Sequence, residues 1–236
     1  QSLDETYPAA PAYRVLYLLH GMFGDETSWL RRTNIERYTQ GMHLAVVMPY
    51  GENSYYTDMA HGVDYFTYLT EELPRFVRAS FPVSWRPADT WIAGLSMGGY
   101  GACKAALTYP ERFAGFACLS GALDIPVLLQ KTKDLAMERL MRNIFGSHLD
   151  AFAGSAYDVY EMARRAVAQG KCVPPVYIAC GRQDTVCSAM NARMAENLQA
   201  LGVPVTYVER SGAHDWAFWD AEIQEVLRWL PAQGKR

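Results

Sequence analysis

The sequence has no long apolar run and no strong excess of charge of either sign. None of its apolar runs approaches the ~18 residues that a membrane-spanning helix needs, so no membrane association is expected. The 22 basic and 25 acidic side chains leave a net charge of −3, and no block of lysine or arginine stands out. This balance argues against the basic surface that nucleic-acid binding requires, so no nucleic-acid partner is expected.

Cysteine is also scarce, and its arrangement excludes two common structural roles. The five cysteines are odd in number and none belongs to a C-x-x-C pair, so neither a disulfide framework nor a zinc site is indicated. We expect reduced, mostly buried thiols in a cytoplasmic protein. The first residues show no signal peptide, but the chain begins at Gln1 and not at methionine, which leaves secretion open.

What the sequence does contain is apolar material for a large core. Half of the residues are hydrophobic and 13% are aromatic, which argues against disorder. There is no internal repeat, low-complexity tract or linker. We therefore expect one domain over residues 1–236, because α/β folds often run past ~200 residues as a unit.

Short β-branched runs alternate with helical patterns, and this alternation predicts an α/β fold. The central sheet should be mostly parallel, with helices on both faces. The expected strands are 14–19, 44–48, 90–93, 113–119, 176–179 and 203–208. The expected helices are 64–80, 97–108, 190–201 and 217–230, and Pro74 should kink or split the first of them.

Two parts of the chain depart from this alternation. Residues 121–171 are mostly helical in pattern and contain no strand signal, so we expect a cap-like helical insertion over the end of the sheet. At the other extreme, few residues precede the first strand. Any edge strands before residue 14 should therefore be short or missing.

The most informative motif is G-x-S-x-G, formed by Gly94, Ser96 and Gly98. An apolar strand precedes it and a helix of small residues follows it, which is the setting of a nucleophile elbow. There the serine hydroxyl is raised above the sheet on a strained turn, and side chains at the two glycines would collide with neighbouring elements. The helix that starts after Ser96 also offers unpaired N–H groups to an oxyanion.

A serine hydroxyl needs a base to take its proton, and past Ser96 the only histidines are His148 and His214. The first lies in the helical insertion and is typical of a surface position. The second follows the strand at 203–208, where Gly212 lets the loop fold back over the sheet. In this architecture the base comes last in the chain, so His214 is the predicted base.

The carboxylate that holds the base should follow an earlier strand. Asp184 lies in a short loop after the strand at 176–179, from which it can reach the far ring nitrogen of His214. Asp215 is the competitor, although adjacent residues rarely have the geometry to share that hydrogen bond. Glu209 also ends a strand, but its strand already delivers His214.

The first strand ends in His20-Gly21, a dipeptide that commonly opens the loop of an oxyanion hole. We expect the backbone N–H groups of Met22 and Met97 to be the two donors, with His20 orienting the loop.

Aromatic residues near the predicted strand ends are candidates for the substrate-binding walls. They are Phe23, Trp29, Tyr55, Tyr56 and Trp216, and the tyrosine pair is the best placed because it follows a strand end and a turn.

Four segments together resemble the esterase D/tributyrin esterase group of α/β-hydrolases, which has feruloyl esterase-like members. They are residues 20–29 (HGMFGDETSW), 55–58 (YYTD), 94–102 (GLSMGGYGA) and 212–219 (GAHDWAFW). The resemblance implies the α/β-hydrolase fold and a hydrolase without metal or cofactor. It also implies a triad of Ser96, Asp184 and His214, in agreement with the reasoning from the residues.

The group includes carboxylesterases for short acyl chains, feruloyl and cinnamoyl esterases, acetyl-xylan esterases and S-formylglutathione hydrolases. We therefore expect a serine carboxylesterase that hydrolyses small-molecule esters of short-chain or small acyl groups through an acyl-enzyme on Ser96. The alternatives are a feruloyl/cinnamoyl or acetyl-xylan esterase acting on plant cell-wall esters, and an acyltransferase with the same triad. Whether the protein forms a homo-oligomer is open.

The resemblance has one departure, at the N-terminus. Chains of this group usually carry two further antiparallel strands before the strand at 14–19, where this sequence offers only residues 1–13. This departure concerns the edge of the sheet and is not expected to touch the site.

Overall fold

The computed structural model describes residues 12–231 and builds them around a six-stranded sheet. The strands are β1 (Arg14–Leu19), β2 (Leu44–Val47), β3 (Thr90–Leu95), β4 (Gly115–Leu119), β5 (Val176–Gly181) and β6 (Val205–Arg210). Their order across the sheet is β2-β1-β3-β4-β5-β6, and every neighbouring pair is parallel. The predicted parallel sheet is confirmed. The expectation about edge strands concerns residues 1–13, of which 1–11 lie outside the described residues, and Tyr13 forms only an isolated bridge with Val83.

The four central strands are buried at every position because helices cover both faces of the sheet. This is why β1, β3, β4 and β5 have continuous apolar runs instead of alternating ones. The edge strands β2 and β6 are only partly buried.

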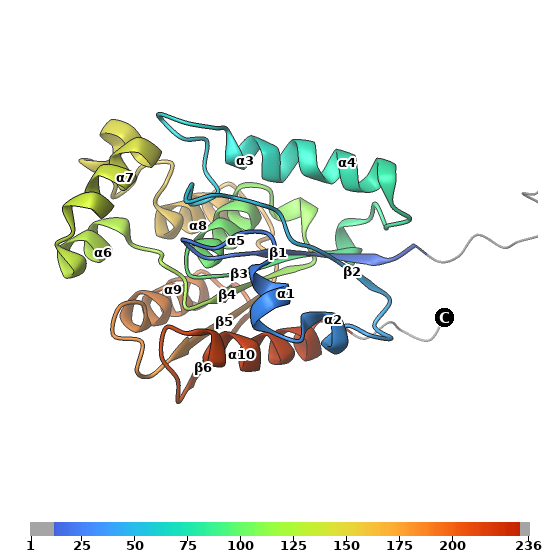
Figure 1. Ribbon diagram of the computed structural model, residues 1–236. Coiled ribbons are helices and arrows are strands. Elements are labelled where there is room, and N and C mark those ends of the chain that lie inside the picture. Colours follow the sequence, from blue (N-terminus) through green and yellow to red (C-terminus); the bar gives the residue numbers. More distant parts are fainter. Residues whose placement is uncertain (1–11, 232–236) are drawn as a thin grey trace, which may run out of the picture.

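Two helical layers enclose the sheet (Figure 1). One layer contains α3 (Tyr65–Thr67), α4 (Leu73–Ser80), α5 (Met97–Thr108), α8 (Val159–Ala168) and α9 (Ser188–Ala200). The other contains α1 (Ser28–Arg32), α2 (Ile35–Tyr38) and α10 (Trp216–Trp229). The sequence patterns did not predict α1 and α2, because helices of five and four residues are too short to show a helical period.

The helix expected over residues 64–80 is split, as Pro74 predicted. A π-helical turn, Tyr68–Glu72, separates α3 from α4, and Pro74 lies in the first turn of α4. Proline is tolerated there because the first turn of a helix has no partner for its missing N–H.

The helical insertion at 121–171 has two parts. Helices α6 (Ile125–Thr132) and α7 (Leu135–Phe145) lie beyond the carboxyl ends of the strands, whereas α8 packs beside α5 in the helical layer (Figure 1). Only the first part therefore extends over the end of the sheet. Short 3₁₀ turns occur at Pro87–Asp89, Pro110–Arg112 and Gly146–Leu149.

Among residues 12–231, no helix combines the length and the apolar character needed to cross a bilayer.

Candidate active site

The candidate site lies at the carboxyl edge of the sheet, between the ends of β1 and β3. The chain passes from β1 outward to β2 and then returns to β3 on the other side of β1. The loops that follow β1 and β3 therefore diverge, and such a switch in strand order leaves a crevice in which α/β proteins bind ligands. The first loop contains Met22 and the second contains Ser96.

Ser96 occupies the sharp turn between β3 and α5. Its φ of +52° and ψ of −116° are strained for a residue with a side chain. A Cβ added at Gly94 would lie 2.3 Å from the carbonyl oxygen of Gly98. A Cβ added at Gly98 would lie 2.6 Å from the carbonyl oxygens of Leu19 and His20. Both positions therefore require glycine, and this lets α5 begin in close contact with β1 and β3.

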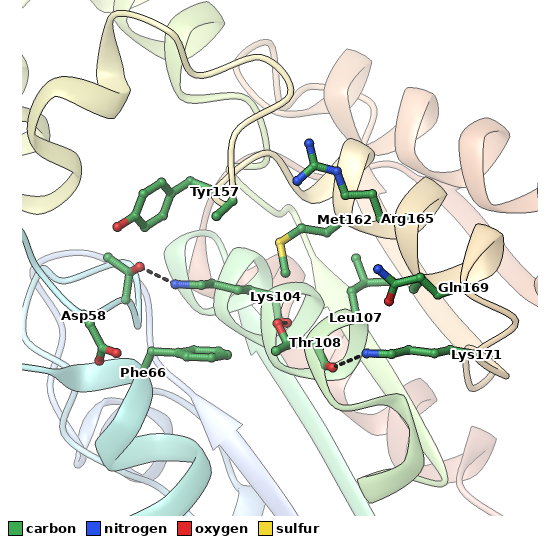
Figure 2. Close-up of a pocket in the computed structure, with 13 residues that line it drawn as sticks. Asp58, Phe66, Lys104, Leu107, Thr108, Tyr157, Met162, Arg165, Gln169 and Lys171 are labelled. Atoms are coloured by element: carbon green, nitrogen blue, oxygen red, sulfur yellow. Dashed lines mark hydrogen bonds between the residues drawn. The ribbon is translucent and has the colours of Figure 1, made fainter.

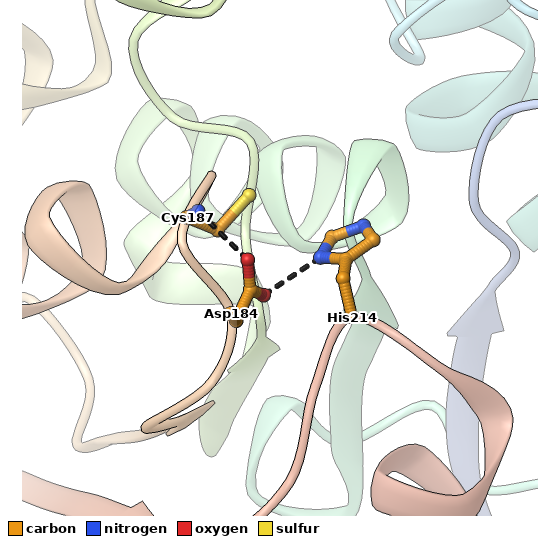
Figure 3. Close-up of side chains that lie close together, drawn as sticks. All are labelled: Asp184, Cys187 and His214. Atoms are coloured by element: carbon orange, nitrogen blue, oxygen red, sulfur yellow. Dashed lines mark hydrogen bonds and ion pairs between the residues drawn. The ribbon is translucent and has the colours of Figure 1, made fainter.

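Side chains from three strand ends form one hydrogen-bonded line. Nε2 of His214, in the loop after β6, lies 3.0 Å from Oγ of Ser96. Nδ1 of the same ring lies 2.7 Å from Oδ2 of Asp184, in the loop after β5 (Figure 3). The Asp184 side chain is fully buried, and the His214 side chain is about one-third exposed. The three predicted residues are thus in contact, with hydroxyl, imidazole and carboxylate in sequence.

The Asp184 carboxylate is held by neighbours on both oxygens. Oδ1 accepts the N–H of Cys187 at 2.9 Å (Figure 3) and that of Val186 at 3.2 Å, and Oδ2 accepts the thiol of Cys180 at 3.5 Å. Burial raises the pKa of the Asp184 carboxyl, but the hydrogen bond and charge of His214 and these further donors lower it by more. Its pKa therefore lies below the usual value, and the group stays ionised behind the imidazole.

The loop that carries His214 is fixed by a close approach of two glycines. A Cβ added at Gly181, the last residue of β5, would lie 2.1 Å from the carbonyl oxygen of Gly212. The Gly212 N–H donates to the Gln183 side chain at 2.6 Å, and its carbonyl accepts the Gln183 N–H at 2.9 Å. The His214 ring packs edge-on against Trp219, with 4.9 Å between the ring centroids.

The competing residues have other partners. Asp215 caps the N-terminus of α10 with its side chain. Glu209 is exposed and accepts a hydrogen bond from the Tyr207 hydroxyl. The His148 ring lies against Tyr157, in the helical insertion. None of the three joins the line at Ser96.

Two backbone N–H groups beside Ser96 have no acceptor within residues 12–231: those of Met22 and Met97. Met97 is the first residue of α5, where a helix leaves its N–H groups without intrahelical partners. Met22 is part of the wall of the cleft that contains Ser96. Both groups are therefore free to bind a negatively charged oxygen.

His20 supports the loop that carries Met22. Its Nδ1–H donates to the carbonyl of Gly21 at 2.8 Å, and its Nε2 accepts the N–H of Gly51 at 3.0 Å. Burial lowers the pKa of His20, which favours this neutral form. The Tyr56 hydroxyl donates to the His20 carbonyl at 3.2 Å.

The cleft at Ser96, hereafter the Ser96 cleft, has a volume of about 320 Å³. Of the predicted aromatic walls, Phe23 and Trp216 line it. Trp29 is buried behind the wall, with its ring edge-on to Trp216 at 5.3 Å between centroids.

The other two predicted wall residues, Tyr55 and Tyr56, need a correction. Each is only 1% exposed. The Tyr55 ring packs against Tyr100 and Phe145 in the core, and neither tyrosine lines the Ser96 cleft. Both residues have positive φ, and the Tyr56 ring packs so closely against α5 that a Cβ added at Gly101 would lie 2.7 Å from it. We therefore place them in the core that supports the site.

Several lining residues were not anticipated. Trp219 and Leu95 are apolar parts of the wall, and Arg31 and Arg32 bring positive charge to it. Arg31 is paired with Asp25 at 2.8 Å. A signal for Trp219 exists in the sequence, since it lies three residues after Trp216, about one turn along a helix. By contrast, α1 was not predicted, so its arginines could not be placed.

Asp184, Cys187 and His214 are also the one group of three metal-ligating side chains found among the described residues. Their ligand atoms lie within 4.8 Å of one another (Figure 3). Asp184 and His214 already hydrogen-bond to each other, so an ion held there would remove both groups from the line to Ser96. The expectation that the protein uses no metal or cofactor stays a prediction.

Comparison with known proteins relates this geometry to a family. The family model described as "Putative esterase" matches residues 2–230. An acetyl esterase from Caldicellulosiruptor saccharolyticus is 35% identical over 222 residues, which cover 92% of this chain and 83% of that protein. The chain belongs to this esterase family.

Two solved structures from Staphylococcus aureus are similar to the esterase along nearly its whole length. The fluorophosphonate-binding serine hydrolase FphF, with substrate bound, has a TM-score of 0.86 and 34% identity, covering 98% of this chain and 89% of that one. The S-formylglutathione hydrolase FrmB has a TM-score of 0.83 and 35% identity, covering 98% and 88%. The predicted α/β-hydrolase fold is confirmed, and the protein is a serine hydrolase that acts on carboxylic ester bonds.

Proposed function

We propose that Ser96 is the nucleophile of this esterase, His214 its general base and Asp184 the residue that orients and stabilises the charged ring. The observation that carries the proposal is the unbroken hydrogen-bonded line from Ser96 Oγ to the Asp184 carboxylate. As Oγ attacks the ester carbonyl carbon, Nε2 of His214 takes the hydroxyl proton and then gives it to the departing alcohol. Water repeats these steps on the acyl-enzyme and releases the acid.

The negative charge of the tetrahedral intermediate develops on the former carbonyl oxygen. We propose that the N–H groups of Met22 and Met97 bind this oxygen, because both lack another acceptor beside Ser96. Each such donor typically contributes about 3 kcal/mol to the stabilisation of the transition state.

We propose small-molecule esters of short-chain or small acyl groups as the substrates. A cleft of about 320 Å³ that is walled by Phe23, Trp216 and Trp219 suits a small apolar acyl group. The similarity to an acetyl esterase over 92% of the chain supports the same size class. One domain over residues 1–236 and a cytoplasmic location remain predictions of the sequence.

The central test is Ser96→Ala with p-nitrophenyl acetate as substrate. We expect kcat to fall by at least ~10⁴-fold, because the hydroxyl that forms the acyl-enzyme is lost. Labelling by a fluorophosphonate probe should disappear with it. A circular dichroism spectrum and melting temperature close to those of the wild type would show that the fold is intact, and undiminished turnover in a folded variant would overturn the proposal.

The acyl preference is tested with a series on the wild-type enzyme: p-nitrophenyl acetate, butyrate and octanoate, and methyl ferulate. We expect kcat/KM to be highest for acetate or butyrate, whereas a maximum for methyl ferulate would assign the enzyme to the feruloyl class. Adding an alcohol or sugar acceptor separates hydrolysis from acyl transfer, because an acyltransferase would form a new ester in place of free acid.

A further inference from the structure

A second hollow borders α5, and the catalytic proposal makes no use of it. It has a volume of about 390 Å³, similar to the smaller ligand pockets of proteins, and we call it the Lys104 cavity. Its lining comes from α5, from α8 with the loops flanking it, and from the segment 57–66. The lining residues are Thr57, Asp58, Phe66, Lys104, Leu107, Thr108, Ala156, Tyr157, Met162, Arg165, Ala166, Gln169 and Lys171.

Lys104 is the unusual group in this cavity. The residue is only 6% exposed, yet within residues 12–231 no carboxylate lies close enough to form an ion pair with it, and Asp58 acts on its charge only from a longer distance. Its ammonium donates one hydrogen bond, to Oγ1 of Thr57. An ammonium has three N–H donors, so two of them have no hydrogen-bond acceptor in the described chain. A buried charge with so few partners is costly, and an anionic ligand would supply what is missing.

Aromatic rings flank this ammonium on two sides. Nζ of Lys104 lies 4.3 Å from the ring centroid of Phe66 and 5.1 Å from that of Tyr157 (Figure 2). Leu107, Met162 and other apolar side chains continue the wall, and most of the lining surface is apolar. The cavity therefore suits a ligand with a flat apolar body next to a charged head.

The charges around the cavity favour a negative ligand. Arg165 and Lys171 lie at the end away from the ammonium (Figure 2). The one carboxylate in the lining, Asp58, is occupied, because its two oxygens accept the N–H and the hydroxyl of Thr67 at 2.9 Å each. Arg165 is already paired with Glu161 at 2.9 Å, and the Lys171 ammonium donates to the Thr108 carbonyl at 3.2 Å. The lining therefore carries three cations and one anion, and Lys104 is the cation with the fewest partners.

We propose that the Lys104 cavity binds a small aromatic carboxylate, whose oxygens accept hydrogen bonds from the Lys104 ammonium and whose ring lies against Phe66 and Tyr157. The site is separate from the triad. Lys104 is eight residues beyond Ser96, which is about 12 Å along a helix. Occupancy would satisfy the buried cation without involving Ser96, so the proposal does not depend on the esterase mechanism.

Burial lowers the pKa of Lys104 to about 7, against the opposing influence of Asp58. The cation that holds the carboxylate is thus lost as the pH rises through neutrality, and affinity should fall. The other charged groups facing the cavity are Asp58, Arg165 and Lys171. Tyr157 also faces it, and burial raises the pKa of its hydroxyl, so it stays neutral.

The test is isothermal titration calorimetry of the full chain with benzoate, and with benzamide as the uncharged probe of the same shape. We expect saturable one-to-one binding of benzoate at pH 6 and at least tenfold weaker binding of benzamide. Between pH 6 and pH 9 the affinity for benzoate should fall at least tenfold. This dependence should vanish in Lys104→Met, which separates the titration of Lys104 from that of its neighbours.

Two variants locate the site. Lys104→Met removes the charge and keeps an apolar stem, and Ala156→Trp fills the cavity from an exposed position without changing any charge. Each should weaken benzoate binding at least tenfold. Arg139→Met, which removes an exposed cation on α7 outside the cavity, is the matched control and should stay within twofold of the wild type.

Several results would overturn the proposal: no binding of benzoate, equal binding of benzamide, or wild-type affinity in both cavity variants. The last result would place benzoate elsewhere, for example in the Ser96 cleft. If Lys104→Met fails to fold, Ala156→Trp decides alone, because its substitution leaves the buried charge in place.

Discussion

Two hollows border α5: the Ser96 cleft at its N-terminus and the Lys104 cavity alongside its second half. Each is associated with a buried ionisable side chain, and the two side chains differ in how many hydrogen-bond partners they have. In the cleft, the buried carboxylate of Asp184 accepts hydrogen bonds from His214, from two backbone N–H groups and from a thiol. In the cavity, the buried ammonium of Lys104 has one hydroxyl and two aromatic rings.

The difference separates a completed polar network from an incomplete one. Asp184 is satisfied before any substrate arrives, so the line from it to Ser96 is ready for proton transfer. Lys104 retains free donors. The pKa values of both groups are lowered, but a lower pKa favours the charged form of the Asp184 carboxyl and the neutral form of the Lys104 amine. The first site stabilises its charged form, and the second destabilises it until a counter-ion is supplied.

The strongest way to break the first network is Asp184→Asn. The amide keeps the shape of the side chain but no longer stabilises the imidazolium or the tautomer of His214 that accepts the Ser96 proton, and we expect kcat to fall by about 10⁴-fold. Steady-state kinetics with p-nitrophenyl acetate measures this loss. Asp215→Asn, at the neighbouring cap of α10, is the control. A loss in the control as large as that in Asp184→Asn would contradict the assignment of the acid.

Two glycines, one at the elbow and one in the loop before α8, differ in the space around them. Gly94→Ala at the elbow would place a Cβ 2.3 Å from a backbone oxygen, so we expect it to lower the free energy of unfolding by about 3 kcal/mol or more. Gly154→Ala, in the loop before α8, meets nothing within 4 Å and carries only the strain of its φ of +76°. That strain costs about 1 kcal/mol.

Urea unfolding of the two glycine variants gives both values. Equal destabilisation by the two substitutions would show that the elbow relaxes around a methyl group, and the steric argument for G-x-S-x-G here would fail.

A third effect concerns Lys104 and the pH dependence of stability. In the folded protein its pKa is about 7, whereas in the unfolded chain it is about 10.4. Between these values the unfolded chain binds a proton that the folded protein does not, so this group makes wild-type stability rise with pH. Below pH 7 both states hold the proton and the cost of burying the charge is constant.

Lys104→Met removes this term. The stability of the variant relative to the wild type should therefore fall by about 3 kcal/mol between pH 6 and pH 9. Urea unfolding of both proteins at the two pH values measures the change, with Arg139→Met as a surface control that should track the wild type. A difference that does not vary with pH would show that the Lys104 ammonium is well solvated, and would remove the contrast between the two hollows.

The sheet and the hydrogen-bonded line at Ser96 could be predicted from the sequence, because each depends on patterns within single short segments. Continuous apolar runs marked the strands that are buried on both faces. The elbow could be recognised because its two glycines and its serine lie within five consecutive residues, 94–98. His214 and Asp184 could be placed because they follow strand ends that must meet at one edge of a parallel sheet.

The features that could not be predicted depend on contacts between segments. Tyr55 and Tyr56 follow a strand end, but no local pattern shows that their rings turn into the core. The thiols beside Asp184 looked like ordinary buried cysteines. The Lys104 cavity joins segments around residues 57–66, 104–108 and 156–171, and nothing in any one of them indicates the others. The division of the insertion 121–171 could not be predicted either. Its helices are all amphipathic, so their patterns do not show which of them lie beyond the strand ends and which packs beside α5.

The separation of the three aligned residues along the chain has a consequence for biosynthesis. Ser96 and His214 are 118 residues apart, and His214 follows β6, the last strand. A ribosome releases the amino end first, so in a nascent polypeptide Ser96 is synthesised well before His214 can reach it. Turnover therefore requires β6 to be in place, and recovered turnover in a refolding experiment would report the docking of this strand.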